Sequence, residues 1–221
     1  MRLLFCACLI TLAGSAASAQ SSAVEVETDR YLSCLERINA DREAAFEDAL
    51  AWRMEGGGWP AAHCEARALI ALGDAVNGAA MLEDQASADA GVRDEAIRVS
   101  MLVEAGDAWL TIERTDDAQR AFTAALDLSP NDASALLGQA ETKLALGLWD
   151  EAESAATASI EQAPTLAGGW RLRALARLET GALDAAWQDM EAAREIEPDN
   201  IDILVLRGRI NEARRLAAQP N

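Results

Sequence analysis

The stretch that decides the fold recurs three times at a spacing of 34 residues: Asp127-Leu128-Ser129-Pro130, Glu161-Gln162-Ala163-Pro164 and Glu195-Ile196-Glu197-Pro198. Each copy follows an alanine-rich segment and precedes a short run of polar or small residues. Proline lacks the amide hydrogen that continues a helix, and the polar residues beside it favour the start of the next helix. The spacing therefore predicts a repeated helix–turn–helix unit.

Small residues follow the same period. Pairs of them lie twelve positions apart in every unit: Gly106 with Ala118, Ala140 with Ala152, and Ala174 with Ala186. Two helices approach closely only where the side chains at their crossing are small, so we expect each pair to mark where the helices of one hairpin meet. In the turns of the later units, Gly147 and Gly181 end one helix, and Asp150 and Asp184 are expected to cap the next.

This period and these positions resemble the tetratricopeptide repeat family. The resemblance covers Val99 to Pro198 as three units, 99–132, 133–166 and 167–200, followed by a capping helix at 201–218 in which Leu204 and Gly208 take a large and a small position. It implies an all-α fold, a right-handed α-solenoid of helical hairpins, with the array at 91–221.

Four positions that the family usually keeps apolar or aromatic hold polar residues in this chain: Gln139, Lys143, Arg173 and Arg177. We expect the stems of the lysine and the two arginines to lie over apolar surface with their charged heads in water.

Upstream of the array the repeat degrades. Helical patterns occupy 29–38, 41–54, 60–73 and 74–85, and the glycine-rich run at 56–58 separates the first two from the last two. We therefore expect diverged hairpins of the same kind over 29–90. A separate helical N-terminal domain is the alternative.

The first 19 residues have the pattern of a secretory leader. Arg2 precedes an apolar run at 3–13, and Ala17-Ser18-Ala19 forms a cleavage signal. The run is too short to span a bilayer. We expect a signal peptide at 1–19, a flexible N-terminus at 20–28 and a mature chain that is periplasmic, in a Gram-negative bacterium, or secreted. Acylation at Cys6 or Cys8 is the alternative, although both lie early in the leader and lack small residues before them.

The formal net charge of −18 is strongly acidic. The shared negative sign repels nucleic acid and anionic lipid surfaces, so we expect neither as a partner and no insertion into a membrane. The same charge attracts a cationic partner, although it also serves simply to keep a surface solvated.

Two cysteines remain after the leader, Cys34 and Cys64, and an even number in an exported protein predicts a disulfide. The alternative is a thiol enzyme that uses both cysteines with His63. Adjacent helical residues such as His63 and Cys64 point about 100° apart, no CxxC motif occurs, and one histidine does not make a metal site. We expect no catalysis, no cofactor, no metal and no small-molecule substrate.

The family resemblance also implies a binding groove, lined by the first helix of each unit, that takes a peptide or helix of another protein. Carried onto this sequence, the groove positions are Val103, Asp107, Leu110, Leu137, Glu141, Leu144, Arg171, Leu175, Leu178, Val205 and Arg209. Two of them, Leu144 and Leu178, have an alternative role in packing between helices.

The groove positions decide which partner we expect. Val103 and Leu137 stand where family members that clamp a terminal carboxylate have lysine, and Asp107 and Glu141 stand where those members have asparagine. This disfavours an anion clamp and favours an amphipathic segment with basic residues. We expect a scaffold or adaptor protein; a structural subunit that self-associates or sits in a fixed envelope complex is the alternative.

Overall fold

A computed structural model describes residues 13–87 and 92–219, with side chains from Glu27 onward. These residues form helices and no strand: α1 (Ala13–Ala40), α2 (Arg42–Met54), α3 (Gly58–Ala71), α4 (Ala75–Ala86), α5 (Glu95–Thr111), α6 (Thr115–Leu128), α7 (Ala133–Ala145), α8 (Trp149–Gln162), α9 (Ala167–Glu179), α10 (Leu183–Ile196) and α11 (Ile201–Ala217). None of these helices is both long enough and apolar enough to cross a bilayer.

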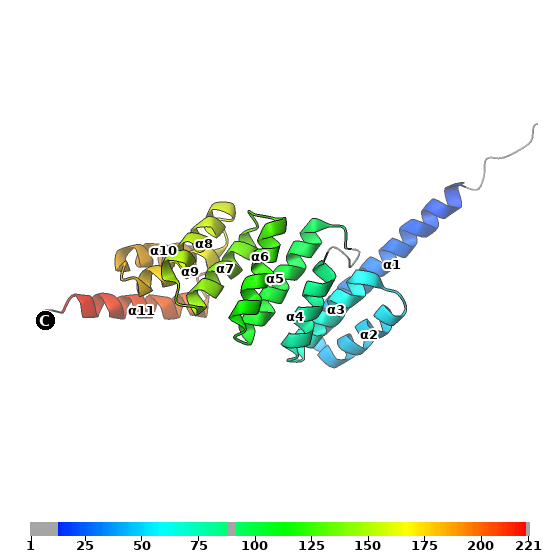
Figure 1. Cartoon of the computed structure of the whole chain (residues 1–221), viewed down its shortest axis with the longest axis horizontal. Coiled ribbons are helices and arrows are strands. Elements are labelled where there is room, and N and C mark those ends of the chain that lie inside the picture. The colour runs from blue at the N-terminus through cyan, green and yellow to red at the C-terminus, as the bar shows by residue number, and fades with distance from the viewer. Residues whose placement is uncertain (1–12, 88–91, 220–221) are drawn as a thin grey trace, which may run out of the picture.

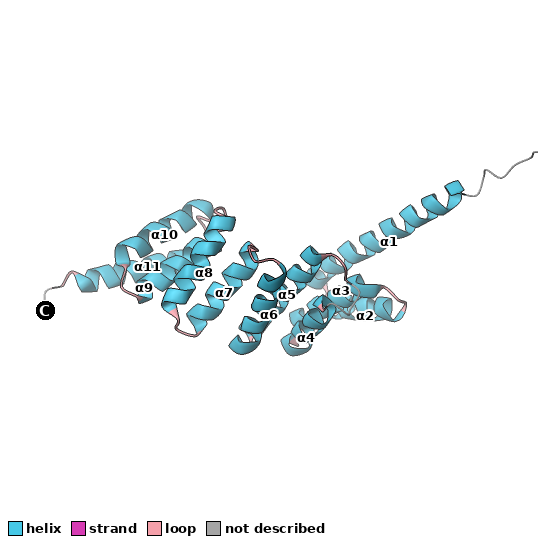
Figure 2. Ribbon diagram, turned by 45° about the horizontal axis from the view of Figure 1, so that its top comes forward, coloured by secondary structure: helices cyan, strands magenta, loops and turns pink. Residues whose placement is uncertain are grey.

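The helices stack in chain order along one long axis (Figures 1 and 2). Each packs on the helix before it and the helix after it, and the first helices of the later hairpins, α5, α7, α9 and α11, also contact one another across the turns. Among the described residues, the second helices α6, α8 and α10 make no comparable contacts with one another. The first helices therefore form the inner wall of an α-solenoid, which confirms the predicted fold class.

The small residues lie where the period placed them. Gly106, Ala140 and Ala174 are buried at equivalent points of α5, α7 and α9. Their partners on the second helices are also fully buried: Ala118, Ala152 and Ala186. The crossing of the two helices in each hairpin is thus closed by small side chains, as predicted.

Phe122 shows why two positions on the first helices require glycine. Its ring is fully buried on α6 and lies between Gly106 of α5 and Gly138 of α7. A Cβ atom added to Gly106 would lie 2.6 Å from the ring, and one added to Gly138 would lie 2.1 Å from it. One aromatic side chain therefore joins two successive hairpins through space that the two glycines leave open.

The turns follow the prediction in part. Gly147 and Gly181 adopt positive φ angles, +71° and +80°, in the left-handed conformation that glycine tolerates best. Asp150 and Asp184 are not the N-caps that we expected. Both lie inside the first turn of their helices, where their negative charges interact favourably with the positive end of the helix dipole.

The expectation that the arginine heads of α9 lie in water was wrong. Arg173 donates to both carboxylate oxygens of Asp189, at 2.9 and 2.8 Å, and Arg177 Nη1 donates to the same carboxylate at 2.7 Å. Arg177 Nε also donates to Glu153 at 2.7 Å, so the network joins α8, α9 and α10. Asp189 is only 3% exposed, and a buried carboxylate requires such partners.

The N-terminal part differs from expectation in one respect. Residues 20–28, which we expected to be flexible, lie within α1. Most of the apolar run of the leader lies outside the described residues, so its role stays a prediction. Helices α1 to α4 form two hairpins, and α4 packs extensively on α5, which makes these hairpins continuous with the array.

The helix at the C-terminal end buries Ile203, Leu206 and Ile210 against the preceding hairpin. Leu204 and Gly208 are at the predicted repeat positions but are not covered: Leu204 is 44% exposed, and a Cβ atom on Gly208 would meet nothing within 4 Å. Gly138 therefore lies in a tightly packed site, whereas Gly208 lies in an open one.

We expect Gly138→Ala and Gly208→Ala to change the stability in opposite directions. Alanine favours a helix over glycine by about 1 kcal/mol, which Gly208→Ala should gain in full because its surroundings are open. At Gly138 the added methyl group meets the Phe122 ring, and overpacking costs about 1–3 kcal/mol. Urea denaturation of the two variants measures the difference; equal stabilisation by both would show that Phe122 does not need the space at Gly138.

Candidate functional site

The inner wall formed by α5, α7, α9 and α11 holds all the predicted groove residues, but they differ in access. Asp107, Glu141, Val205 and Arg209 are exposed. Six others are half-buried: Val103, Leu110, Leu137, Arg171, Leu175 and Leu178. Asp107, Glu141, Val205 and Arg209 are therefore more available to a partner than the leucines are.

Leu144 is a correction to the predicted groove. It is only 9% exposed and packs with Ala140, Ala152 and Leu172 in the core between α7, α8 and α9. Leu137 also has a packing role, because its methyl groups lie against Gly168 of α9. A substitution of either leucine would test the stability of the stack rather than binding alone.

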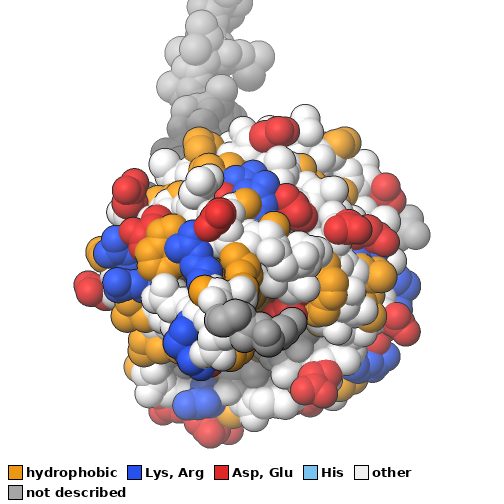
Figure 3. Space-filling view, turned by 90° about the vertical axis from the view of Figure 1, so that its left-hand side faces the viewer, with side chains coloured by type: hydrophobic (Ala, Val, Ile, Leu, Met, Phe, Trp, Pro, Cys, Tyr) orange, Lys and Arg blue, Asp and Glu red, His pale blue; other side chains and the backbone are white. Residues whose placement is uncertain are grey.

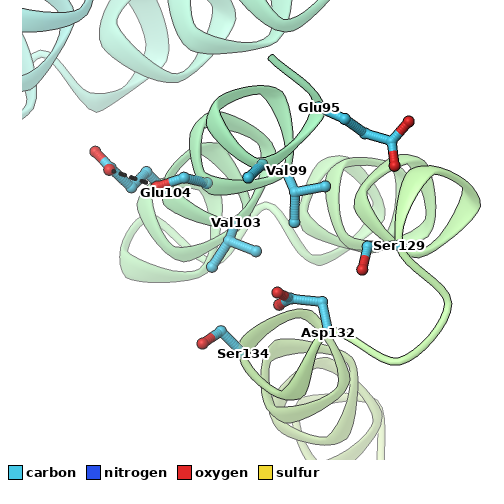
Figure 4. A pocket seen from close by; sticks show the side chains of 9 residues that line it. Glu95, Val99, Val103, Glu104, Ser129, Asp132 and Ser134 are labelled. Atoms are coloured by element: carbon cyan, nitrogen blue, oxygen red, sulfur yellow. Dashed lines mark hydrogen bonds between the residues drawn. The ribbon is translucent and has the colours of Figure 1, made fainter.

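A pocket of about 340 Å³ opens between α5, α7 and the turn that joins α6 to α7 (Figure 4). Its apolar part consists of Ala96, Val99 and Val103 on α5. The polar part is formed by three carboxylates and three hydroxyl groups: Glu95, Glu104, Asp132, Ser100, Ser129 and Ser134. None of the nine described residues that line it is a lysine or arginine, so the pocket suits a side chain with an aliphatic stem and a positively charged or hydrogen-bond-donating end.

The residues from the α6–α7 turn were not predicted. Ser129 and Asp132 lie beside a repeat proline, where the sequence indicates only a turn and a cap. Asp132 does cap α7, because its Oδ1 accepts a hydrogen bond of 2.8 Å from the amide of Ala135. The repeat pattern places α5 and α7 side by side, but it does not show that this turn closes one side of a pocket.

A chain of polar contacts holds Glu104 in place at the pocket. Tyr31 Oη on α1 lies 2.7 Å from His63 Nδ1 on α3, and His63 Nε2 lies 3.2 Å from Glu104 Oε2 on α5. Ser100 Oγ donates to the other carboxylate oxygen of Glu104 at 3.4 Å, and Arg67 Nε lies 3.5 Å from Oε2. The contacts tie the first hairpins to the array and orient one carboxylate of the pocket.

The same contacts keep Glu104 ionised. Burial by itself raises the pKa of the Glu104 carboxyl, but the hydrogen bond from His63 and the charges of His63 and Arg67 outweigh it and lower the pKa below its usual value. Glu104 therefore contributes a fixed negative charge to the inner wall.

The three residues of the thiol-enzyme alternative do not form a nucleophile and its base. Cys34 on α1 is joined to Cys64 on α3 by a disulfide, with Cα atoms 6.4 Å apart. Both nitrogens of His63 are in contact with Tyr31 and Glu104. A disulfide sulfur has no thiolate to offer, so this arrangement has the structural role of fastening α1 to α3.

Asp107 lies one turn after Glu104 on α5, and its pKa reflects the negative charge of the inner wall. Although the residue is exposed overall, its carboxylate lies on the concave side, where protein atoms replace part of its hydration. This burial, together with the negative charges of Glu141 and Glu104, raises the pKa of Asp107 to about 6. A positive charge placed beside these carboxylates would relieve the repulsion.

The sign of the wall changes toward the C-terminal end. Arg171 on α9 is half-buried, and Arg209 on α11 donates to Glu179 at 2.6 Å. The inner wall is thus acidic over α5 and α7 and carries arginines over α9 and α11.

Comparisons with known proteins agree with this architecture. Residues 113–176 match a family model described as a tetratricopeptide repeat. A search of curated protein sequences found no match. Among solved structures, MamA superposes with a TM-score of 0.61 at 18% identity, over 74% of this chain and 92% of MamA.

Two further structures are informative for the groove. YrrB, a TPR protein with an unusual peptide-binding site, gives a TM-score of 0.58 at 18% identity, over 85% of this chain and 97% of YrrB. The first TPR of Spaghetti (RPAP3) bound to the HSP90 peptide SRMEEVD gives 0.52 at 20% identity, over 58% of this chain and all of that one. At these identities the likeness shows the fold alone.

We expect the Asp107 carboxyl group to titrate near pH 6 in the folded chain, well above its ordinary value of 3.8. Because the folded state favours the protonated form, this group stabilises the chain as the pH falls through about 6, and Asp107→Asn should remove that contribution. Carbon-detected NMR measures the midpoint. Glu141→Gln should lower it and Glu161→Gln should not; a midpoint near 3.8 in the wild-type chain would contradict the electrostatic description of the wall.

Proposed function

We infer that this tetratricopeptide-repeat chain is a non-catalytic scaffold that holds a segment of another protein against its inner wall. The observation that carries the proposal is the open pocket between α5 and α7, with its valine side chains and its three carboxylates. Asp132 and Glu104 also have structural contacts, but the curved wall of first helices leaves the pocket open to the space where an extended or helical segment fits.

The charge of the wall supports a partner with basic residues. The Spaghetti neighbour is bound to SRMEEVD, a peptide with three acidic residues. In this chain such a peptide would meet three acidic residues, Glu104, Asp107 and Glu141, and the contacts of Glu104 keep its carboxylate ionised. The partner that matches both parts of the wall is an amphipathic segment. Its basic side chains lie over the acidic α5 and α7, and its acidic or neutral end lies toward Arg171 and Arg209.

The proposed location is the periplasm or the cell exterior, after cleavage of the leader behind Ala19. The leader pattern of the first 19 residues supports export. The disulfide between Cys34 and Cys64 supports the same location, because structural disulfides persist in oxidising compartments and are rare in the cytosol.

Binding is tested by capture from envelope extract on the immobilised protein, followed by quantitative mass spectrometry. Asp107→Lys with Glu141→Lys reverses two charges on the inner wall and should lower capture of the specific partner by about tenfold or more. The matched control, Asp127→Lys with Glu161→Lys, makes the same change of charge at exposed positions on the second helices α6 and α8. Capture should also weaken as salt is added.

Equal capture by wild-type protein and the inner-wall variant would refute binding in the groove. Loss of capture in both charge variants would mean that net charge alone, and not the wall, attracts the partner.

The mass of the protein recovered from cells tests its export. We expect a mature chain that begins at Gln20 and whose two cysteines resist alkylation until a reductant is added. Rapid alkylation of both cysteines without reductant, or recovery of the chain with its leader intact in the cytosol, would contradict the proposed location. The Cys34→Ala, Cys64→Ala double variant should be less stable by up to about 3–4 kcal/mol, because the bridge closes a loop of 30 residues.

A further inference from the structure

The outward side of α11 carries the repeat positions of a first helix, and within the described residues no second helix covers them as in the earlier units. Leu102 and Leu136 take this position in α5 and α7 and are 7% and 9% exposed. The α9 equivalent, Trp170, is half-buried, whereas Leu204 is 44% exposed. The small residue one turn later is buried in every earlier unit, yet Gly208 has open space around it. Within the part of the chain that the structure describes, no element packs on this side of α11.

Position 207 adds a charge to this open side. Arg207 stands 34 residues after Arg173, at the same point of the repeat. Arg173 uses that position to reach across its hairpin and bind both oxygens of Asp189 on the second helix α10. Arg207 is exposed and, within residues 13–87 and 92–219, makes no hydrogen bond or ion pair. Its positive charge contributes to lowering the pKa of Glu191 on α10.

Leu204 and Gly208 lie beside another exposed apolar residue on a well-anchored helix. Ile201, which precedes Leu204 by one turn of α11, is 75% exposed. On its other side α11 is anchored by its buried isoleucine and leucine residues and by Arg214, which pairs with Asp184 and lies 5.1 Å from the ring of Trp187. Figure 3 looks onto this end of the molecule and shows hydrophobic side chains among both basic and acidic ones.

We propose that this face of α11, formed by Leu204, Arg207 and Gly208 with Ile201, binds an amphipathic helix of a partner protein, which serves as the second helix of a fourth hairpin. The repeat itself defines the chemistry of that helix. In α10 a small residue, Ala186, meets the first helix at the crossing, and an acidic residue three positions later, Asp189, binds the arginine. The partner helix therefore carries a small residue to pack on Gly208 and an aspartate or glutamate three positions later for Arg207.

This surface is separate from the inner-wall groove, so the proposal stands without the groove binding anything. It differs from an ordinary capping helix, whose outer face is polar because nothing covers it.

The chain provides a suitable probe, since α10 already has the required pattern. A fluorescent peptide with the sequence of residues 181–197 is titrated with the full-length protein, and its anisotropy and helicity are measured. We expect saturable binding with a rise in helicity. Gly208→Leu and Arg207→Glu in the protein should each weaken binding by about tenfold, and a peptide with Asp189→Arg should recover binding to the Arg207→Glu protein.

Two controls locate the peptide. Arg209→Glu makes the same charge change on the groove side of α11, where it breaks only an exposed ion pair with Glu179, and should leave binding unchanged. The inner-wall variant Asp107→Lys with Glu141→Lys should also bind normally.

Three outcomes would overturn the proposal. The first is no binding of the peptide, and the second is binding that Gly208→Leu and Arg207→Glu leave intact or that the inner-wall variant abolishes. The third comes from light scattering: if the free protein is a dimer that Gly208→Leu converts to a monomer, the face joins two copies of this chain and does not receive a partner helix.

Discussion

The structure depends on helices that approach one another closely at small residues. Gly106 and Gly138 leave the space into which Phe122 fits, and the alanines at the other crossings are fully buried. No hairpin buries its own apolar surface completely, so each must pack on the next, and the stack becomes a curved array. The inner wall, its pocket and the open side of α11 all follow from this arrangement, because each is a place where the stacking leaves first-helix side chains uncovered.

Charges are arranged differently in the interior and on the wall. Asp189 is buried but bonded by Arg173 and Arg177, and this satisfied network joins three helices. Among the described residues no cation pairs with Asp107, and its pKa is raised to about 6 by burial and by the neighbouring carboxylates. A buried carboxylate with fixed partners stabilises a fold. A carboxylate on a concave wall without a paired cation can instead bind a positively charged group of another molecule.

The N-terminal hairpins are fastened by means that the later units do not use. End units of a solenoid have only one neighbour, so they gain less from stacking. Here the disulfide between Cys34 and Cys64 joins α1 to α3, and the contacts from Tyr31 through His63 to Glu104 continue to α5. These links compensate for the diverged sequence of the first two hairpins.

The sequence by itself determined the order of the hairpins and the length of most helices, although α1, expected at 29–38, spans Ala13–Ala40. The proline period, the small residues at the crossings and the glycine turns are local signals, and the expected segments 41–54, 60–73 and 74–85 differ by at most two residues at either end from α2, α3 and α4. Local signals suffice here because a helix hairpin is held by contacts between residues close in the chain.

Only the tertiary structure decided which groove residues are accessible and which polar residues find partners. Leu144 repeats a groove position but is covered by α8 and α9, and the arginines of α9 meet acidic groups from two other helices. The pocket needs a turn that the period marks only as a boundary, and the contacts around Glu104 join residues from three helices. Such features depend on where side chains distant in sequence come to lie after stacking, and periodicity within one unit carries no information about that.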